Sequence, residues 1–260
     1  MKIPFYQTHW FDLSLKDIAS NIGHAFNTVA DQAIYDRIYQ AILTQEKPFS
    51  EEWRIKKLTL AKWLNKFFIE RNFQNAKILS VGCGFGIVEQ SLIQQGLKID
   101  LQECQNKSLL YFNRKYPEES QKTKQWISQT LTDIPEQSYD VVMAITSTYG
   151  LDEKTLSSFF GRLSQIIKPG GICIFYETVL TLADLKYYLV NRLRRRLPEG
   201  ILWGWKRSPK VFLNFARASG LRVREKHFFD SHNREIKPKV WLNSCFSNET
   251  AWQMLILENR

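Results

Sequence analysis

The sequence predicts an α/β fold in which helices cover both faces of a parallel sheet. From residue 76 to about residue 180, short apolar runs alternate with helical stretches, and a glycine-rich loop joins the first run to the first helix. Strands that are covered on both faces read as continuous apolar runs, and their alternation with helices is typical of a parallel sheet. The length of 260 residues fits one large domain, or one domain with an attached cap.

Two helical regions are predicted before the sheet, at residues 13–45 and 50–72. In the second region apolar side chains recur at near-helical spacing, with charged residues between them: Trp53, Leu60, Leu64, Phe67 and Phe68. Ser50 followed by two glutamates predicts the start of this helix, because serine caps free N–H groups and acids favour the first turn. We therefore expect a helical N-terminal cap at residues 1–75 and a second domain at residues 76–260.

Five apolar runs are predicted to be the first five strands of the sheet: Lys77–Val81, Lys98–Cys104, Lys124–Gln129, Tyr139–Ile145 and Ile172–Glu177. The helices predicted between them end at residues that favour termination. These are Gly96 after the first helix, Pro117 after Lys107–Lys115, and Pro169-Gly170-Gly171 after Glu153–Lys168.

Regular patterns are weaker beyond residue 180. A basic helix is predicted over Thr181–Leu197 and a further helix over Pro209–Ser219, which Gly220 ends. Leu221–Phe229 and Thr250–Glu258 are predicted to be the last two strands. We expect the segment between those strands to be a long polar loop.

A glycine loop, Gly82-x-Gly84-x-Gly86, lies directly between a predicted strand and a predicted helix. Glycine permits a tight turn and close approach of a ligand to the backbone, and the helix N-terminus offers free N–H groups there. The dinucleotide fingerprint Gly-x-Gly-x-x-Gly is not met, because Ile87 or Glu89 stands at its third glycine. A Walker-type Gly-Lys-Ser/Thr sequence is absent as well, so the loop is expected to bind a different nucleotide-containing ligand.

The segment Leu79–Gly86 reads Leu-Ser-Val-Gly-Cys-Gly-Phe-Gly, and it resembles the first motif of the class I S-adenosylmethionine-dependent methyltransferases. Ser80 stands where that family often has an acid. Glu103, which lies 17 positions after Gly86, matches the acid that ends the family's second strand. Three later family motifs are matched by Ile134-Pro135, Tyr139-Asp140-Val141-Val142 and Ile167-Lys168-Pro169-Gly170-Gly171.

This resemblance implies a Rossmann-like, doubly wound sheet of seven strands in the order 3-2-1-4-5-7-6, with the last strand antiparallel. It also implies S-adenosyl-L-methionine as the cofactor, with its ribose hydroxyls bound by Glu103, since a carboxylate accepts two hydrogen bonds at once. Thr130 stands at the position of the family's adenine-contacting acid, so its hydroxyl is expected to contact the adenine amino group while Leu131 packs on the ring.

The N-terminal region resembles that of the quinone-biosynthesis-like, small-molecule methyltransferases, whose N-terminal helices close over the cofactor. Phe26-Asn27-x-Val29-Ala30 followed by Tyr35-Asp36 carries this likeness. If the cap closes in this way, Tyr35 and Arg54 reach the cofactor carboxylate. The complete set of expected cofactor-binding residues is Gly82, Cys83, Gly84, Gly86, Glu103, Thr130, Leu131, Thr146, Tyr35 and Arg54.

Candidates for the catalytic step are expected where the strands end, because ligands of open α/β sheets bind beyond the carboxyl ends of the strands. His232, in the loop after the sixth predicted strand, is a candidate base, with a solvated loop histidine as the alternative. Tyr149 is expected to contact cofactor or acceptor, and Glu177 either to bind the acceptor or to cap neighbouring backbone. We expect His227 to be structural, and His9 and His24 to lie away from the ligand.

The segment at about residues 181–208 follows the fifth strand, where this family often inserts acceptor-binding structure. Its predicted helix carries a leucine stripe at Leu182, Leu185, Leu189, Leu193 and Leu197, beside Arg192, Arg194, Arg195 and Arg196. A lid over the acceptor, a phosphate clamp, a membrane-surface helix and a core-packing helix with a solvated basic face all stay open. Trp203 and Trp205 are expected to line the acceptor pocket or to pack the lid.

The net charge of +10 comes almost wholly from the last 80 residues, which carry +9, whereas residues 76–180 carry −1. A basic surface favours an anionic partner, which here is expected to be a small anionic or lipid-linked acceptor. A nucleic-acid methyltransferase is a weaker alternative. Thr146-Ser147-Thr148-Tyr149 replaces the Asn/Asp-Pro-Pro-aromatic motif of base methylation, and no RNA-binding module is recognisable. A cofactor-binding scaffold without turnover is the third alternative.

Four separated cysteines and four scattered histidines show no metal-ligand spacing, so no metal site is expected. No apolar run reaches the roughly 18 residues that span a bilayer. No signal peptide is visible, so the expected location is the cytoplasm, with peripheral membrane contact left open.

Overall fold

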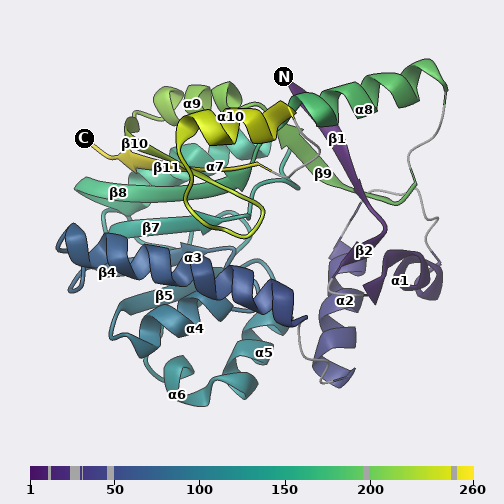
Figure 1. Ribbon diagram of the computed structural model, residues 1–260. Helices are drawn as coiled ribbons and strands as arrows, with labels where there is room; N and C mark the ends of the chain where they lie inside the picture. The colour runs from purple at the N-terminus through teal and green to yellow at the C-terminus, as the bar shows by residue number, and fades with distance from the viewer. Residues whose placement is uncertain (11–12, 24–29, 31, 46–49, 196–198, 247–250) are drawn as a thin grey trace.

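A seven-stranded sheet lies at the centre of the computed structural model, which describes residues 1–10, 13–23, 30, 32–45, 50–195, 199–246 and 251–260 (Figure 1). Its strand order is β10-β11-β8-β7-β4-β5-β6. All neighbouring strands are parallel except β11, which is antiparallel to both β8 and β10. The predicted strand order and the antiparallel last strand are therefore confirmed. The strands are β4 (Lys77–Val81), β5 (Lys98–Glu103), β6 (Gln125–Ile127), β7 (Tyr139–Ile145), β8 (Ile167–Thr178), β10 (Arg222–Phe229) and β11 (Trp252–Glu258).

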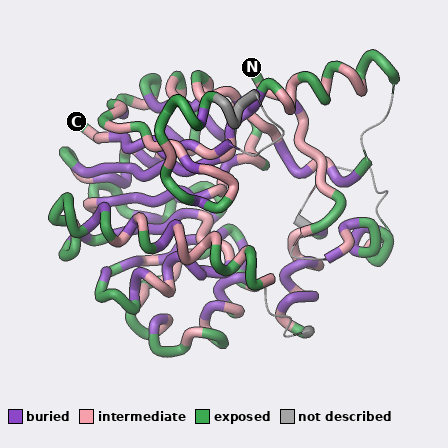
Figure 2. The backbone as a smooth tube through the Cα atoms, viewed as in Figure 1, coloured by how far each residue is buried: buried purple, intermediate pink, exposed green. Residues whose placement is uncertain are grey.

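Helices cover both faces of this sheet and enclose two apolar cores. Successive residues of a strand point to opposite faces, so Ile78 lies in one core and its neighbour Leu79 in the other. Figure 2 shows the strands as an almost continuous buried layer between the helices. The first core is closed by α3 (Glu51–Glu70), α4 (Ile87–Gln94) and α5 (Asn106–Lys115), and the second by α7 (Glu153–Ile166) and α9 (Pro209–Ala218). The short α6 (Pro117–Ser120) follows α5.

The N-terminal region contains strands that the sequence analysis did not predict. It comprises β1 (Lys2–Gln7), β2 (His9–Trp10), β3 (Leu13–Ser14), α1 (Leu15–Asn21) and α2 (Gln32–Gln45). β1 pairs antiparallel with β9 (Ile201–Arg207), which lies almost 200 positions later in the chain. Local periodicity carries no signal of such a distant partner, and this is why β1 and β9 were missed.

The N-terminal elements form a third apolar core, in which Leu15, Ile34 and Ile38 pack with Trp203 of β9. By contrast α3, which also lies within residues 1–75, contributes Leu64 and Phe68 to a core of the central sheet. The division at residue 75 stays a prediction, although the packing joins α3 to the sheet and the earlier elements to β9.

The segment after β10 is not a loop throughout, and the expectation of a long polar loop there was wrong. It contains α10 (Pro238–Phe246), with Trp241 buried against Val179 and Ala251. The Trp241 indole N–H donates to the carbonyl of Trp252 (3.0 Å). Because one buried anchor and its distant partners hold this helix in place, the polar local sequence gave little indication of it.

The basic helix of the 181–208 segment is present as α8 (Leu182–Leu193). It begins at a capping box in which the side chains of Thr181 and Asp184 each accept a hydrogen bond from the backbone N–H of the other. Within the described part of the chain, no helix has the length and apolar character needed to cross a membrane.

Candidate active site

A cavity of about 810 Å³ lies at the carboxyl ends of β4, β5, β7 and β8, where a ligand of an open α/β sheet is expected. One wall consists of the loops that follow these strands, and the opposite wall comes from β1, β2, α2 and β9. Most of the predicted site residues line this cavity, whereas Arg54 and His232 do not. Those that line it are Glu103, Thr130, Leu131, Thr146, Tyr35, Tyr149 and Glu177, together with Gly82, Cys83, Gly84 and Gly86.

The glycine loop turns sharply between β4 and α4. The backbone N–H of Gly82 donates to the carbonyl (2.9 Å) and to the side-chain oxygen (3.0 Å) of Gln102 on β5. A Cβ atom at Gly82 would lie 2.6 Å from Cβ of Ser147, and one at Gly86 would overlap the ring of Phe112. At Gly84 a Cβ atom would meet no atom within 4 Å. Packing therefore requires glycine at positions 82 and 86, whereas Gly84 leaves open space for a ligand.

Glu103 connects this loop to the end of β5. One carboxylate oxygen accepts the N–H of Gly84 (2.7 Å), and the other accepts the N–H of Cys104 (3.1 Å). The side chain is buried, and burial raises its pKa, although both hydrogen bonds act in the opposite direction. The structure thus places the predicted ribose-binding carboxylate against the glycine loop.

A second carboxylate under the loop was missed by the sequence analysis. Glu89, in the first turn of α4, is buried and accepts a hydrogen bond from the hydroxyl of Ser80 (2.6 Å). Ser80 stands where the resembling family often has an acid. In this chain an acid from the following helix occupies that neighbourhood, and burial raises its pKa. The small residue at Ser80 was the available signal, since it makes room for Glu89.

Thr130, Leu131 and Thr146 line the cavity just beyond the ends of β6 and β7. Leu131 is buried and Thr130 is exposed, and both line the cavity after β6. Leu131 and Thr146 have positive φ angles of 61° and 55°, an uncommon conformation for residues other than glycine. The N–H of Thr146 donates to the carbonyl of Tyr176 (2.8 Å), which fixes the end of β7 against β8.

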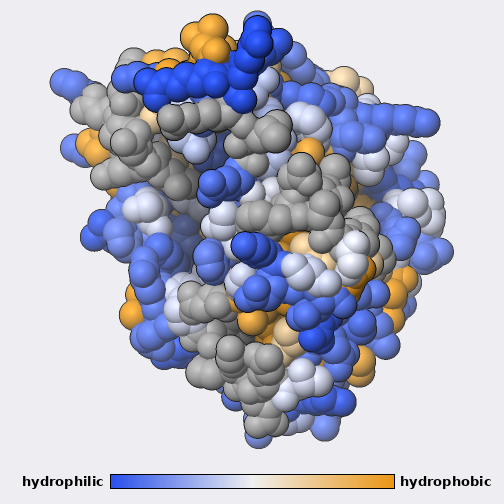
Figure 3. All heavy atoms as spheres, turned by 90° about the vertical axis from the view of Figure 1, so that its right-hand side faces the viewer, coloured by the Kyte–Doolittle hydropathy of each residue, from blue (hydrophilic) through white to orange (hydrophobic). Residues whose placement is uncertain are grey.

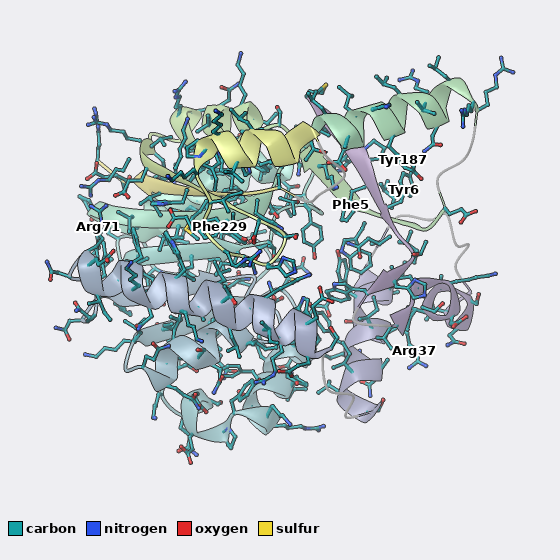
Figure 4. The ribbon with its side chains drawn as sticks, viewed as in Figure 1. Phe5, Tyr6, Arg37, Arg71, Tyr187 and Phe229 are labelled. Carbon is teal, nitrogen blue, oxygen red and sulfur yellow. The ribbon has the colours of Figure 1, made fainter. Side chains whose placement is uncertain are left out.

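Aromatic side chains form the wall opposite the strand ends. Trp10, Tyr35 and Trp203 come from β2, α2 and β9, and their ring centroids lie 5.0 to 6.2 Å apart. Phe5 of β1 also lines the cavity and extends this wall. Figure 4 labels Phe5 on the β1 strand. Burial raises the pKa of Tyr35 far above its usual value, so its hydroxyl is a hydrogen-bond donor at all physiological pH values.

Arg54 does not line the cavity, which corrects the expectation that it reaches the cofactor. Its guanidinium is exposed and makes two hydrogen bonds of 3.0 Å to Glu51 on the same helix. Lys57, one turn further along α3, lines the cavity instead. Among the described residues, no carboxylate lies within salt-bridge distance of its ammonium group, and desolvation lowers its pKa. The sequence shows that Arg54 and Lys57 lie three positions apart on one predicted helix. It does not show which of the two side chains faces the cavity.

Glu177 lies near the end of β8, and Tyr149 lies in the loop between β7 and α7. One carboxylate oxygen of Glu177 accepts both the N–H (3.0 Å) and the hydroxyl (2.6 Å) of Thr148. Burial raises the pKa of Glu177, and it raises the pKa of Tyr149 to about 12. Glu177 thus caps backbone, one of its two predicted roles, while it also lines the cavity.

The structure does not bring His232 into the cavity. Its side chain is exposed, and its ring nitrogen lies 3.3 Å from the hydroxyl of Ser231. His227 contacts Glu235 (2.7 Å) and Glu225 (3.2 Å) away from the cavity, in keeping with a structural role. His9 is exposed, and His24 lies outside the described residues, as do Phe26, Asn27 and Val29.

The 181–208 segment contributes to the cavity through β9 and not through α8. Trp203 and Lys206 line the cavity, whereas no residue of α8 does so. Lys206 is engaged in an ion pair with Asp184 of α8 (2.6 Å). Across the described ranges, no group of three or more His, Cys, Asp or Glu side chains is placed to hold a metal ion.

Comparison with known proteins identifies the family. Residues 51–228 match the model of a family described as a methyltransferase domain, which is well over half of the chain. No curated protein sequence matches the chain.

Solved structures share the fold at low sequence identity. A SAM-dependent methyltransferase from Methanosarcina mazei is 15% identical, with a TM-score of 0.56 over 74% of this chain and 96% of that one. A candidate sarcosine dimethylglycine methyltransferase from Galdieria sulphuraria is 13% identical, with a TM-score of 0.58 over 78% and 86%. Geranyl diphosphate C-methyltransferase from Streptomyces coelicolor, in complex with Mg²⁺, geranyl diphosphate and S-adenosyl-L-homocysteine, is 14% identical, with a TM-score of 0.54 over 95% and 98%.

Proposed function

Because the chain belongs to the methyltransferase-domain family, we propose that it transfers a methyl group from S-adenosylmethionine to an oxygen or nitrogen atom of a small anionic or lipid-linked molecule. One observation carries this proposal. A single cavity is lined by the glycine loop and Glu103, by the aromatic wall and by Lys57. Both reactants of a methyl transfer therefore have a place within one enclosed space.

The glycine loop, Glu103 and Leu131 fit the cofactor. Gly84 leaves open space beside the loop, and Glu103 places a carboxylate at the end of β5, where it can accept ribose hydroxyls. Leu131 offers an apolar surface for the adenine ring. When bound, S-adenosylmethionine supplies an activated methyl group, so the protein's own task is to hold the acceptor in line and to exclude water.

The size of the cavity and the charge of Lys57 fit a small acceptor that carries negative charge. A volume of about 810 Å³ exceeds what one nucleotide-sized cofactor fills, within the range of small-molecule sites of about 300–1,000 Å³. Lys57 provides a positive charge that forms no salt bridge among the described residues, and the carboxylates that attract it, Glu89 and Glu177, act from beyond that distance. A half-buried ammonium next to aromatic rings such as Trp53 favours an anionic group on the ligand.

Glu177 replaces His232 as the proposed base. One of its carboxylate oxygens is held by Thr148, so its orientation is fixed, and its raised pKa brings it closer to the pH at which a base is effective. Tyr149, with a pKa of about 12, keeps its proton near neutral pH and is proposed to donate a hydrogen bond to the acceptor.

Two measurements, made one after the other, test this function. Calorimetry with S-adenosylmethionine and S-adenosylhomocysteine establishes cofactor binding, and methyl transfer is then measured with panels of small carboxylates, phosphates and neutral amines. Anionic acceptors are expected to be methylated. Cofactor binding without turnover on any acceptor supports the scaffold alternative, and turnover only on long RNA, lost with rising salt, supports the nucleic-acid alternative.

A pair of variants on α3 tests the anionic acceptor. Lys57→Gln is expected to raise the KM for an anionic acceptor about tenfold, because it removes a charged hydrogen bond. Arg54→Gln is the matched control, since Arg54 lies on the same helix but is exposed and paired with Glu51. Equal KM values in the two variants contradict the assignment of Lys57.

A further inference from the structure

α8 differs from the helices around the sheet because none of its 12 residues is buried. Figure 1 shows it extending from the body of the molecule at the upper right, and Figure 2 shows it without a buried segment. Helices that belong to a core, such as α7, bury four side chains. The packing alternative for this segment, a core helix with a solvated basic face, is therefore excluded.

The leucines of α8 form a ridge that points to solvent. Leu182, Leu189 and Leu193 lie seven and four positions apart, so they stand on the same side of the helix. Their exposed fractions are 49%, 46% and 82%. Tyr187, labelled in Figure 4 on the same helix, is 72% exposed. An amphipathic helix normally turns such a ridge inward, so its outward direction is typical of a surface that binds a partner.

Polar contacts on the other side of α8 hold the helix in this orientation. Asp184, nearly opposite the leucine ridge, completes the cap with Thr181 and pairs with Lys206 of β9. These contacts attach the first turn of α8 to the rim of the cavity, which Lys206 lines. The orientation is thus built into the fold through named side chains.

Basic side chains flank the ridge. Lys186, Arg192, Arg194 and Arg195 are all exposed, and Asp184, the acid of this helix, is already engaged with Lys206. Figure 3 shows strongly hydrophilic side chains beside hydrophobic ones at the top of the face where α8 lies. Exposed leucines between basic residues are complementary to a surface with an apolar interior and negative head groups.

The neighbouring helix α10 continues the same composition. Val240 and Leu242 are exposed apolar residues, and Lys237 and Lys239 are exposed bases beside them. α10 contacts α8, and Figure 1 shows the two helices next to each other along the top of the molecule. We call α8 together with the exposed residues 237–242 the α8–α10 surface.

We propose that the α8–α10 surface binds the face of an anionic phospholipid bilayer, with the leucine ridge at head-group depth and the basic side chains on lipid phosphates. A bilayer accommodates both features at once, since its interface takes up apolar side chains and its phosphates pair with Lys and Arg. This binding does not depend on the proposed methyl transfer. Because α8 is attached at the rim of the cavity, it would bring the acceptor entrance close to the lipid surface.

Vesicle co-sedimentation of the full chain tests the proposal. The protein is expected to bind vesicles of phosphatidylcholine mixed with phosphatidylglycerol, and to bind phosphatidylcholine alone far more weakly. Replacing Lys186, Arg192 and Arg194 by Gln is expected to weaken binding to the mixed vesicles by roughly 100-fold, and raised salt is expected to do the same. Replacing Leu182, Leu189 and Leu193 by Ser is expected to weaken it at least tenfold, because the ridge then no longer inserts.

Matched controls separate this surface from general charge attraction. Ile55, Ile69 and Ile127, which are 53%, 50% and 56% exposed elsewhere, are replaced by Ser, and the exposed Lys16, Lys62 and Lys115 by Gln. Both control sets are expected to bind vesicles like the wild type. Failure of the wild type to bind, or equal losses in the control sets, overturns the proposal. A wild-type dimer that the leucine variant converts to a monomer in light scattering also overturns it, in favour of an interface between two copies.

Discussion

Three buried glutamates surround the cavity, and their partners give them different roles. Glu103 accepts backbone N–H groups of the glycine loop, Glu89 accepts the hydroxyl of Ser80, and Glu177 accepts Thr148. Burial raises the pKa of each, since a low-dielectric environment disfavours the charged form. Carboxyl groups with raised pKa values in a cavity are typical of functional sites, where such a cost to stability is retained.

Glu103→Ala is expected to weaken S-adenosylmethionine binding about 100-fold or more. The change removes the carboxylate that accepts two hydrogen bonds, and hydrogen bonds to charged groups contribute about 1.5–3 kcal/mol each. Isothermal titration calorimetry measures the effect. Glu103→Gln, which keeps one acceptor oxygen, is expected to lie between the alanine variant and the wild type. An unchanged affinity in the alanine variant would falsify the role of Glu103.

Glu177→Gln is expected to stabilise the fold at neutral pH while it lowers turnover. The folded-state pKa of Glu177 is raised above the ordinary value of 4.5, so the ionised carboxyl destabilises the fold once the pH exceeds that range. The amide removes this cost, and a gain of about 2–4 °C in Tm, the shift produced by about 1 kcal/mol in a domain of this size, is expected near pH 8. The gain is expected to disappear as the pH falls below about 4.5, where the wild-type carboxyl is protonated in both states. Thermal unfolding across pH measures it, and a gain that persists at low pH contradicts the assignment.

The loop between β4 and α4 shows how one short element combines structural and ligand-facing positions. Gly82 and Gly86 are surrounded by Ser147 and Phe112, whereas Gly84 faces open space. All three have φ angles near +60°, so any side chain there adopts an unfavourable conformation. A side chain at Gly82 or Gly86 would also clash with its neighbours, whereas a side chain at Gly84 would not.

Gly84→Ala and Gly86→Ala are expected to separate ligand binding from folding. Gly84→Ala adds backbone strain of about 1–2 kcal/mol and a methyl group in the cofactor space, so affinity falls while the protein stays folded. Gly86→Ala adds the same strain and an overlap with the Phe112 ring, which costs about 1–3 kcal/mol more. Tm is therefore expected to fall further in Gly86→Ala. Thermal unfolding and calorimetry of both variants test this order, and the reverse order would contradict it.

At the scale of the whole molecule, the cavity exists because two distant parts of the chain are joined. β9 pairs with β1, and its last residue, Arg207, is fully buried. The Arg207 guanidinium donates to the carbonyls of Thr148 (3.2 Å) and Leu151 in the loop after β7. This arginine therefore attaches the N-terminal wall to the loop that carries Tyr149.

Cofactor binding is expected to stabilise both walls of the cavity together. At a S-adenosylmethionine concentration of about 100 Kd, binding contributes about 2.7 kcal/mol, which corresponds to a rise of roughly 5–10 °C in Tm. Hydrogen exchange is expected to slow in α2 and β9 as well as in the glycine loop, because all three line the cavity. Protection confined to the glycine loop would show that the N-terminal wall does not close on the cofactor.

Most strands of the sheet and the residues of the glycine loop were predicted from the sequence alone. Apolar runs placed β4, β5 and β7 almost to the residue, and the glycine spacing and the position of Glu103 identified the loop and its carboxylate. These features are local, since a strand, a turn and the residue at a strand end are set by neighbours in the chain. Periodicity therefore suffices to find the strands, whereas the role expected of Glu103 rests on the resemblance to the class I methyltransferases.

Which side chains face the cavity and which face solvent depends on contacts between distant parts of the chain. Lys57 points inward and Arg54 outward, His232 lies outside, and the leucine ridge of α8 is exposed. A helical stripe predicts that a face is apolar, but the contacts of distant residues determine what that face meets. The pairing of β1 with β9 is of the same kind, because its hydrogen bonds join strands almost 200 positions apart.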